Sequence, residues 1–109
     1  MHIVLFRAKI RLFDEEYTRV AARMRELAMT EFGCLDFQAV TEGDDEVAIS
    51  RWPDEASIRA WRQHPEHLEA QRKGRERWYR SWSIEVAEVT RSYEGHGGLA
   101  SSAPKNDGR

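Results

Sequence analysis

The chain has 109 residues, the size of one domain, and 40% of them are hydrophobic, which is enough to bury a modest core. This composition excludes a chain that is disordered throughout. Seventeen Lys and Arg residues against nineteen Asp and Glu residues leave a net charge of −2, which argues against a general nucleic-acid-binding protein.

Neither a membrane anchor nor a disulfide framework is predicted. No stretch approaches the roughly 18 apolar residues of a membrane-spanning helix. The first twelve residues lack the basic leader and the small-residue cleavage site of a secretion signal. Cys34 is the single cysteine, which excludes an internal disulfide and a thiolate metal site. We therefore expect a cytoplasmic protein.

The N-terminal part predicts a strand followed by an amphipathic helix. Residues 2–11 are rich in β-branched and apolar side chains, which is typical of a strand. Asp14 is a suitable N-cap, and apolar residues then recur from Tyr17 to Ala28 at the spacing of one helix face. Gly33 is placed to end this helix.

The next segment predicts a β-hairpin. Leu35, Phe37 and Ala39 alternate with side chains that point to the opposite face, as in a strand. The Gly-Asp-Asp sequence at 43–45 is typical of a turn, and residues 47–52 then form the returning strand.

A second helical region follows the hairpin. Pro53 cannot continue the strand, and Asp54 is available as a helix cap. Pro65 interrupts this helix, and a new helical run is expected from residue 66 to about residue 80.

The C-terminal part predicts one more strand and then a tail. Residues 83–93 carry apolar side chains in a strand-like pattern. From residue 95 the composition changes to Gly, Ser, Ala and Pro, which is typical of disorder. We therefore expect one domain at 1–94 and a disordered tail at 95–109.

The element order β-α-β-β-α-β is that of the ferredoxin-like fold, an α+β architecture with an antiparallel four-stranded sheet and helices on one face. The first strand nevertheless carries apolar residues on both faces, with Ile3 and Leu5 opposite Val4 and Phe6. Because the helices cover only one face, the other is an uncovered apolar surface. The simplest cover is a second copy of the sheet, so we predict a homodimer.

The stretch from Trp52 to Trp82 is chemically the richest and contains all four tryptophans. On a helix that starts near residue 66, one side is shared by His67, Gln71, Arg75 and Trp78. Imidazole, amide and guanidinium groups beside aromatic rings predict a pocket for a planar, oxygenated or anionic organic molecule. The alternative is that the tryptophans and Tyr79 serve only as core or interface anchors.

Two histidines fall in this stretch. His64 precedes Pro65 and is suited to cap the interrupted helix through a ring nitrogen. His67 is the better candidate for proton transfer or ligand contact, because the helix gives it neighbours four and eight residues further on; a solvent-facing histidine is the alternative. No third imidazole or carboxylate joins the pair, so no metal site is predicted.

Several short motifs of this stretch resemble those of a known family. They are Ser50-Arg51-Trp52, Trp61 with His64 and His67, Ala70-Gln71, Gly74-Arg75, Trp78-Tyr79 and the closing strand Val86 to Tyr93. With them, residues 2–94 resemble the antibiotic biosynthesis monooxygenase family of dimeric α+β barrel proteins. The resemblance is greatest to the bacterial branch labelled heme-degrading monooxygenase.

This resemblance implies a ferredoxin-like dimer with a substrate cleft between the sheet and the helices. The family includes cofactor-independent oxygenases of aromatic phenols, heme-cleaving oxygenases, isomerases and members with no assigned activity. In the oxygenases the substrate or heme supplies the reactivity towards oxygen, and the protein supplies orientation and proton transfer.

The heme-degrading signature is only partly present. It requires an asparagine on the first strand, a tryptophan in the second helical region, and a histidine ten residues later as iron ligand. Trp61 matches the tryptophan, Gln71 stands at the histidine position, and Asn106 in the tail is the single asparagine. Heme binding or degradation is therefore an alternative, with His67 as a substitute ligand.

The leading hypothesis is a cytoplasmic homodimeric monooxygenase that acts on a small aromatic or quinol-like molecule without metal or flavin. His67 accepts a proton, Arg75 stabilises a phenolate, and Trp61 joins them as the third catalytic residue. The substrate-binding residues are Trp52, His64, Gln71, Trp78 and Tyr79. A non-catalytic, ligand-binding stress-response dimer is the alternative from another functional class.

Overall fold

A computed structural model describes residues 1–97. Its elements are β1 (His2–Ile10), α1 (Glu15–Glu31), β2 (Asp36–Glu42), β3 (Asp45–Trp52), α2 (Glu55–Gln63), α3 (Pro65–Lys73), the π-helical turn η1 (Gly74–Trp78) and β4 (Tyr79–Glu88). The predicted ferredoxin-like α+β fold is confirmed. No helix within these residues is long and apolar enough to cross a membrane.

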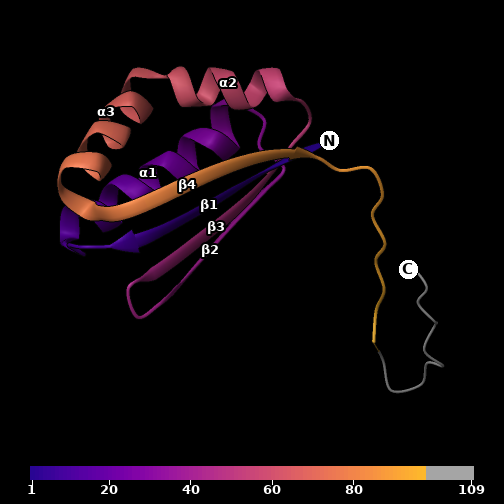
Figure 1. Cartoon of the computed structure of the whole chain (residues 1–109). Coiled ribbons are helices and arrows are strands. Elements are labelled where there is room, and N and C mark those ends of the chain that lie inside the picture. Colours follow the sequence, from indigo (N-terminus) through magenta and orange to yellow (C-terminus); the bar gives the residue numbers. More distant parts are fainter. Residues whose placement is uncertain (98–109) are drawn as a thin grey trace.

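The strands form one antiparallel sheet in the order β2-β3-β1-β4, and the helices all lie over one of its faces (Figure 1). The register sets Ala8 of β1 beside Glu46 of β3 and beside Trp82 of β4. It also sets Thr41 of β2 beside Glu46. These four side chains therefore form one row across the sheet on the side of the helices.

The helix boundaries follow local signals that the sequence predicts. The Asp14 carboxylate accepts a hydrogen bond from the Tyr17 backbone N–H at 2.8 Å, which caps α1. Gly33 follows α1 with a φ of 76°, a conformation that glycine adopts without strain. Asp54 caps α2 in the same way as Asp14 caps α1, and Pro65 separates α2 from α3.

The end of the second helical region differs from the prediction. The expected helix to about residue 80 stops at Trp78 after a π-helical turn, and β4 covers 79–88 rather than 83–93. Tyr79 already pairs with Ile10 of β1, so the strand begins as soon as the chain reaches the sheet. It ends opposite the beginning of β1, because the last ladder partner of β4 is His2.

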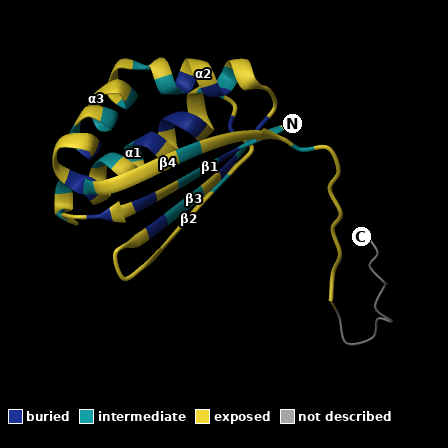
Figure 2. Ribbon diagram, viewed as in Figure 1, coloured by how far each residue is buried: buried dark blue, intermediate teal, exposed yellow. Residues whose placement is uncertain are grey.

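The core lies between the sheet and the helices in two clusters. The larger cluster contains Val4, Met24, Leu27, Ala28, Cys34, Trp52, Ile58 and Trp61. The smaller one contains Ile10, Tyr17 and Trp78. Buried residues accordingly follow the strands and the sheet-facing side of α1, whereas the outer sides of α2 and α3 are exposed (Figure 2).

Within the described part of the chain, the opposite face of the sheet carries no helix (Figure 1). Leu5 and Ile49 are register partners on this face, and Ile49 is 38% exposed. Val40, which pairs with Val47 on the same face, is 61% exposed. The predicted uncovered apolar face is therefore present in the chain. The predicted tail at 95–109 lies outside the described residues except for residues 95–97.

Candidate functional site

A cleft of about 380 Å³ lies between the helix-covered face of the sheet and the segment formed by α1, α3 and η1. Ala39 of β2, Ala48 of β3 and Ala21 of α1 all line it, so small side chains leave its middle open. The volume falls in the roughly 300–1,000 Å³ range of small-molecule sites. Most of the lining is apolar or aromatic.

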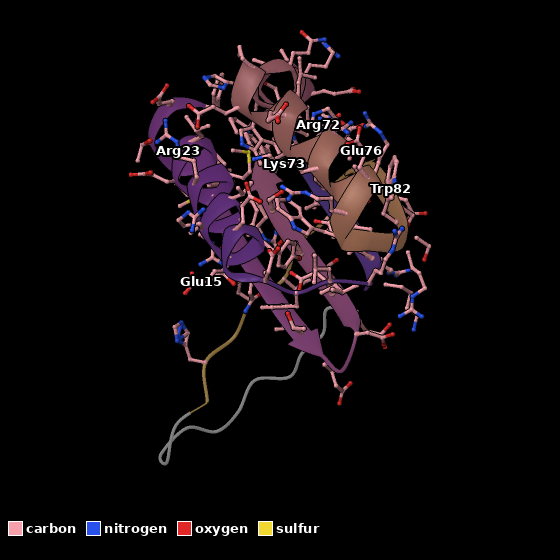
Figure 3. All side chains as sticks on the ribbon, turned by 90° about the vertical axis from the view of Figure 1, so that its left-hand side faces the viewer. Glu15, Arg23, Arg72, Lys73, Glu76 and Trp82 are labelled. Carbon is pink, nitrogen blue, oxygen red and sulfur yellow. The ribbon has the colours of Figure 1, made fainter. Side chains whose placement is uncertain are left out.

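Ion pairs connect α1 and α3, the helices that cover the cleft. Arg23 of α1 contacts Glu66 of α3 at 2.8 Å, and Lys73 of α3 contacts Glu16 of α1 at 2.6 Å. Figure 3 labels Arg23 of α1 and Lys73 of α3, one residue from each of these two ion pairs. The two ion pairs thereby link the two helical segments above the sheet.

One end of the cleft is built around an imidazole. The His67 ring packs edge-on against the Trp61 ring, with centroids 4.2 Å apart. Gln71 Nε2 lies 2.9 Å from His67 Nδ1 and donates a hydrogen bond to the Arg62 carbonyl oxygen at 3.1 Å. The Trp61 indole N–H donates to the Met24 carbonyl oxygen at 3.0 Å, which fixes the ring against α1.

These contacts define the proton positions on His67. The Arg62 carbonyl can only accept, so the Gln71 atom beside it is the amide nitrogen, and this nitrogen also donates to His67 Nδ1. The ring proton therefore resides on Nε2. Burial, followed by the nearby charge of Arg62, lowers the pKa of His67 to about 4. Near neutral pH His67 is a neutral ring with its proton on Nε2.

Guanidinium groups stand around the same cleft. Arg25 lies over the Phe37 ring at 5.4 Å from its centroid, and Arg62 and Arg75 also line the cleft. Arg75 is exposed and has no ion-pair partner within residues 1–97. It is therefore available to a bound molecule.

The other end of the cleft is built around a carboxylate. Glu46 is only 9% exposed, and the Thr41 hydroxyl donates a hydrogen bond to its Oε1. The rings of Tyr17 and Tyr79 meet edge-on, with centroids 6.0 Å apart. Burial, with the charge of Glu46 as a further cause, raises the pKa of Tyr17 to about 12 and that of Tyr79 still further. Both phenols are therefore protonated near neutral pH.

The η1 turn places Tyr79 in this end of the cleft. Gly74 is buried, and a Cβ at this position would lie 2.6 Å from Cε2 of the Tyr79 ring. Its φ of −59° is ordinary for a helix, so close packing of the ring, rather than backbone freedom, requires glycine here. The structure thus gives the packing reason for a glycine inside a helical segment.

The structure brings most of the predicted site residues together. The cleft is lined by Trp61, His67, Gln71, Arg75, Trp78 and Tyr79. Trp52 and His64 lie elsewhere. Trp52 is fully buried in the core and donates to the Ser50 hydroxyl at 2.8 Å, and His64 caps α3 by accepting from the Glu66 backbone N–H at 3.1 Å.

Sequence reasoning missed four of the polar groups that line the cleft. They are Tyr17, Arg25, Glu46 and Arg62. For Glu46 a signal exists, because it alternates along β3 with Ala48 and Ser50, which face the helices. A carboxylate at an inward position of a strand is unusual enough to mark a site.

Comparison with known sequences identifies the family. The family model described as antibiotic biosynthesis monooxygenase matches residues 1–73. The uncharacterized protein YqjZ of Bacillus subtilis is 39% identical over 79 residues, which covers 72% of this chain and 69% of YqjZ. The η1 turn and β4 lie beyond the matched range of the family model.

Solved structures share the fold. Rv0793 from Mycobacterium tuberculosis is similar with a TM-score of 0.72 at 18% identity, covering 85% of this chain and 98% of that one. SnoaB, a cofactor-independent oxygenase from Streptomyces nogalater, is similar with a TM-score of 0.70 at 16% identity. The match covers 84% of this chain and 94% of SnoaB. The sequence match and the fold agree: the chain belongs to the antibiotic biosynthesis monooxygenase family.

Proposed function

We propose that this protein is a cofactor-independent monooxygenase that oxidises a small aromatic compound bearing a hydroxyl group, a phenol or quinol. The observation that carries the proposal is the aromatic cleft, which has a neutral imidazole, a free guanidinium and a buried carboxylate on its walls. Family membership and the description of SnoaB as a cofactor-independent oxygenase support it.

The reaction balances without a cofactor. A phenol with an open para position and O₂ give the para-quinone and water, so the substrate supplies all the electrons. One oxygen atom enters the ring and the other leaves as water. The protein must hold the ring, stabilise the phenolate as charge develops, and move protons.

The lining residues suit these tasks. Arg75 provides a positive charge for the phenolate or the peroxide formed from it, and the neutral His67 donates a hydrogen bond through Nε2. A pKa of about 4 with Nδ1 already engaged by Gln71 does not favour His67 as the first proton acceptor, so we assign it the donor role instead. Trp61 and Tyr79 hold the substrate ring from two sides.

The residues do not fit the heme alternative. Within residues 1–97, His67 is the one histidine that lines the cleft, and its ring nitrogens carry either a proton or the hydrogen bond from Gln71. Iron ligation through Nε2 requires the other tautomer, in which Nδ1–H faces the amide hydrogens of Gln71. The cleft therefore does not provide a ligand for heme iron within residues 1–97.

We further propose that the protein acts as a homodimer through the helix-free face of the sheet. Leu5 and Ile49 lie side by side on this face, with Val40 and Val47 next to them along the sheet. An apolar surface of this kind is normally covered in a protein in solution. A second copy of the same sheet provides that cover with two-fold symmetry.

The test uses purified protein treated with chelator and freed of flavin. Oxygen consumption and quinone formation are followed with 1-naphthol, which gives 1,4-naphthoquinone and water. We expect equal amounts of oxygen consumed and quinone formed, and a loss of turnover of about 100-fold in Arg75→Ala. Arg72→Ala is the matched control, because this arginine pairs with Glu69 and Glu76 on the outer surface.

Two results would count against the proposal. No protein-dependent turnover with bound 1-naphthol would indicate the binding-only alternative. Unchanged turnover in both Arg75→Ala and His67→Ala would remove these residues from the mechanism.

A further inference from the structure

A carboxylate that no cation of residues 1–97 pairs with lies inside the cleft. Glu46 is 9% exposed, and no Lys, Arg or His nitrogen within residues 1–97 lies within 4 Å of it. Its two neighbours in the chain differ, because Asp44 pairs with Arg80 at 2.6 Å and Asp45 pairs with Lys9 at 2.5 Å. Burying an unpaired charge is costly unless a partner or a function requires it.

The protein meets only part of the hydrogen-bonding capacity of this carboxylate. Thr41 donates to Oε1, whereas Oε2 accepts no hydrogen bond from a residue within 1–97. An ionised carboxylate has about four acceptor positions, so capacity remains for a ligand. Because Glu46 lines the cleft, a molecule in the cleft can supply the missing donor.

The groups around Glu46 are neutral. Thr41 comes from β2, Ala8 from β1, Tyr17 from α1 and Tyr79 from the start of β4, and both tyrosines are protonated near neutral pH. Trp82, 46% exposed, stands in the same row at the β4 edge of the cleft (Figure 3). Within residues 1–97 no cation lies within 4 Å of Glu46, whereas a neutral aromatic ring with a hydroxyl donor finds both an acceptor and aromatic walls here.

We propose that Glu46 binds the hydroxyl group of the substrate and is its first proton acceptor, which makes the cleft selective for neutral aromatic compounds that carry a hydroxyl donor. The part of this inference that concerns turnover rests on the proposed function. The O–H bond breaks as its proton passes to Glu46, and the electron pair enters the ring. The para carbon of the ring then forms a bond to O₂, which is thereby reduced to a peroxide, and Glu46 returns the proton to the outer peroxide oxygen. The O–O bond breaks as the para carbon loses its hydrogen as a proton and forms the second C=O bond, and this proton joins the leaving hydroxide to give water.

Binding tests the selectivity without any turnover. The probes are 1-naphthol and 1-methoxynaphthalene, which share a ring system but differ in the hydroxyl donor, and binding is followed under anaerobic conditions by quenching of tryptophan fluorescence. Hydrogen bonds to charged acceptors correspond to a preference of about tenfold or more for 1-naphthol in the unmodified protein. Glu46→Gln keeps the shape but removes the charge, and we expect its preference to fall to about threefold or less.

Asp45→Asn is the matched control. Asp45 is an exposed carboxylate on the same strand that faces away from the cleft and pairs with Lys9. We expect this variant to keep the full preference. Thermal unfolding verifies that each variant is folded. If Glu46→Gln does not fold, Glu46→Asp replaces it. This variant keeps the charge but has a shorter side chain, and we expect it to show an intermediate preference for 1-naphthol.

The outcomes separate this inference from the proposed function. If 1-naphthol binds and is oxidised but Glu46→Gln keeps the tenfold preference, the role of Glu46 is wrong and the oxygenase proposal stands. The same holds if the unmodified protein does not distinguish the two probes. If neither probe binds, both proposals are overturned.

Discussion

Replacing Gly74 by alanine tests how the η1 turn positions Tyr79. A Cβ at residue 74 would lie 2.6 Å from Cε2 and 2.8 Å from Cδ2 of the Tyr79 ring. Ordinary contacts between carbon atoms are about 3.5–4.0 Å, so the ring must move by about 1 Å. Retreat is restricted, because the Phe6 ring lies 5.4 Å and the Tyr17 ring 6.0 Å from the Tyr79 centroid.

Two effects of opposite sign decide the stability of Gly74→Ala. In a helical conformation, alanine raises the free energy of unfolding by about 1 kcal/mol relative to glycine. Overpacking against a confined ring costs about 1–3 kcal/mol, and the short contact distances place this variant near the upper end. We therefore expect a net loss of about 1–2 kcal/mol in the free energy of unfolding, which corresponds to a fall in Tm of roughly 5–15 °C.

Urea unfolding of four proteins measures this effect: the unmodified chain, Gly74→Ala, Tyr79→Ala and the double variant. Without the ring only the helix preference remains, so Gly74→Ala in the Tyr79→Ala background should stabilise by about 0.5–1 kcal/mol. The sign of the substitution thus reverses between the two backgrounds. Equal effects in both backgrounds, or a stabilised single variant, would refute the packing argument.

Two further predictions concern His67 and the open sheet face. The pKa of His67 is lowered from 6.5 to about 4 in the folded protein, so between these pH values the unfolded chain binds a proton that the folded protein does not. The contribution of neutral His67 to the free energy of unfolding is therefore fully present above about pH 6.5 and is lost as the pH falls towards 4, by roughly 3 kcal/mol at most. Urea unfolding between pH 7 and 4 should show this loss in the unmodified protein, and a His67→Gln variant with an equally steep loss would contradict it. Ile49→Glu places a charge on the open face, and we expect analytical ultracentrifugation to show a dimer for the unmodified chain and a monomer for this variant, with unchanged circular dichroism. A monomer in both cases would refute the dimer proposal.

Local chemistry explains why the fold is predictable from this sequence. Asp14 and Asp54 cap helices, Gly33 ends one and Pro65 divides another, and each acts through its own backbone or an immediate neighbour. The positions of the strands follow from alternation. The end of the helix at Trp78 is not predictable in this way, because it depends on the pairing of β4 with β1, far away in the sequence.

The candidate site is predictable only in part. Helical spacing groups His67, Gln71 and Arg75, and these three do line the cleft. Residue spacing does not show how deeply a side chain is buried. Trp52, at the end of β3, is fully buried in the core and does not line the cleft. Glu46 follows two exposed aspartates in the sequence. Alternation places it on the same face of β3 as Ala48 and Ser50, but only the folded sheet shows that this face meets the helices.

The most direct test of the proposed oxygenase is isotope labelling of its product. The metal- and flavin-free protein is incubated with 1-naphthol under ¹⁸O₂, and the quinone and water are analysed by mass spectrometry. We expect one labelled oxygen atom in each quinone and one in each water molecule formed, at a rate that depends on Arg75. A quinone with no label, or the same rate of labelled quinone without the protein, would contradict it.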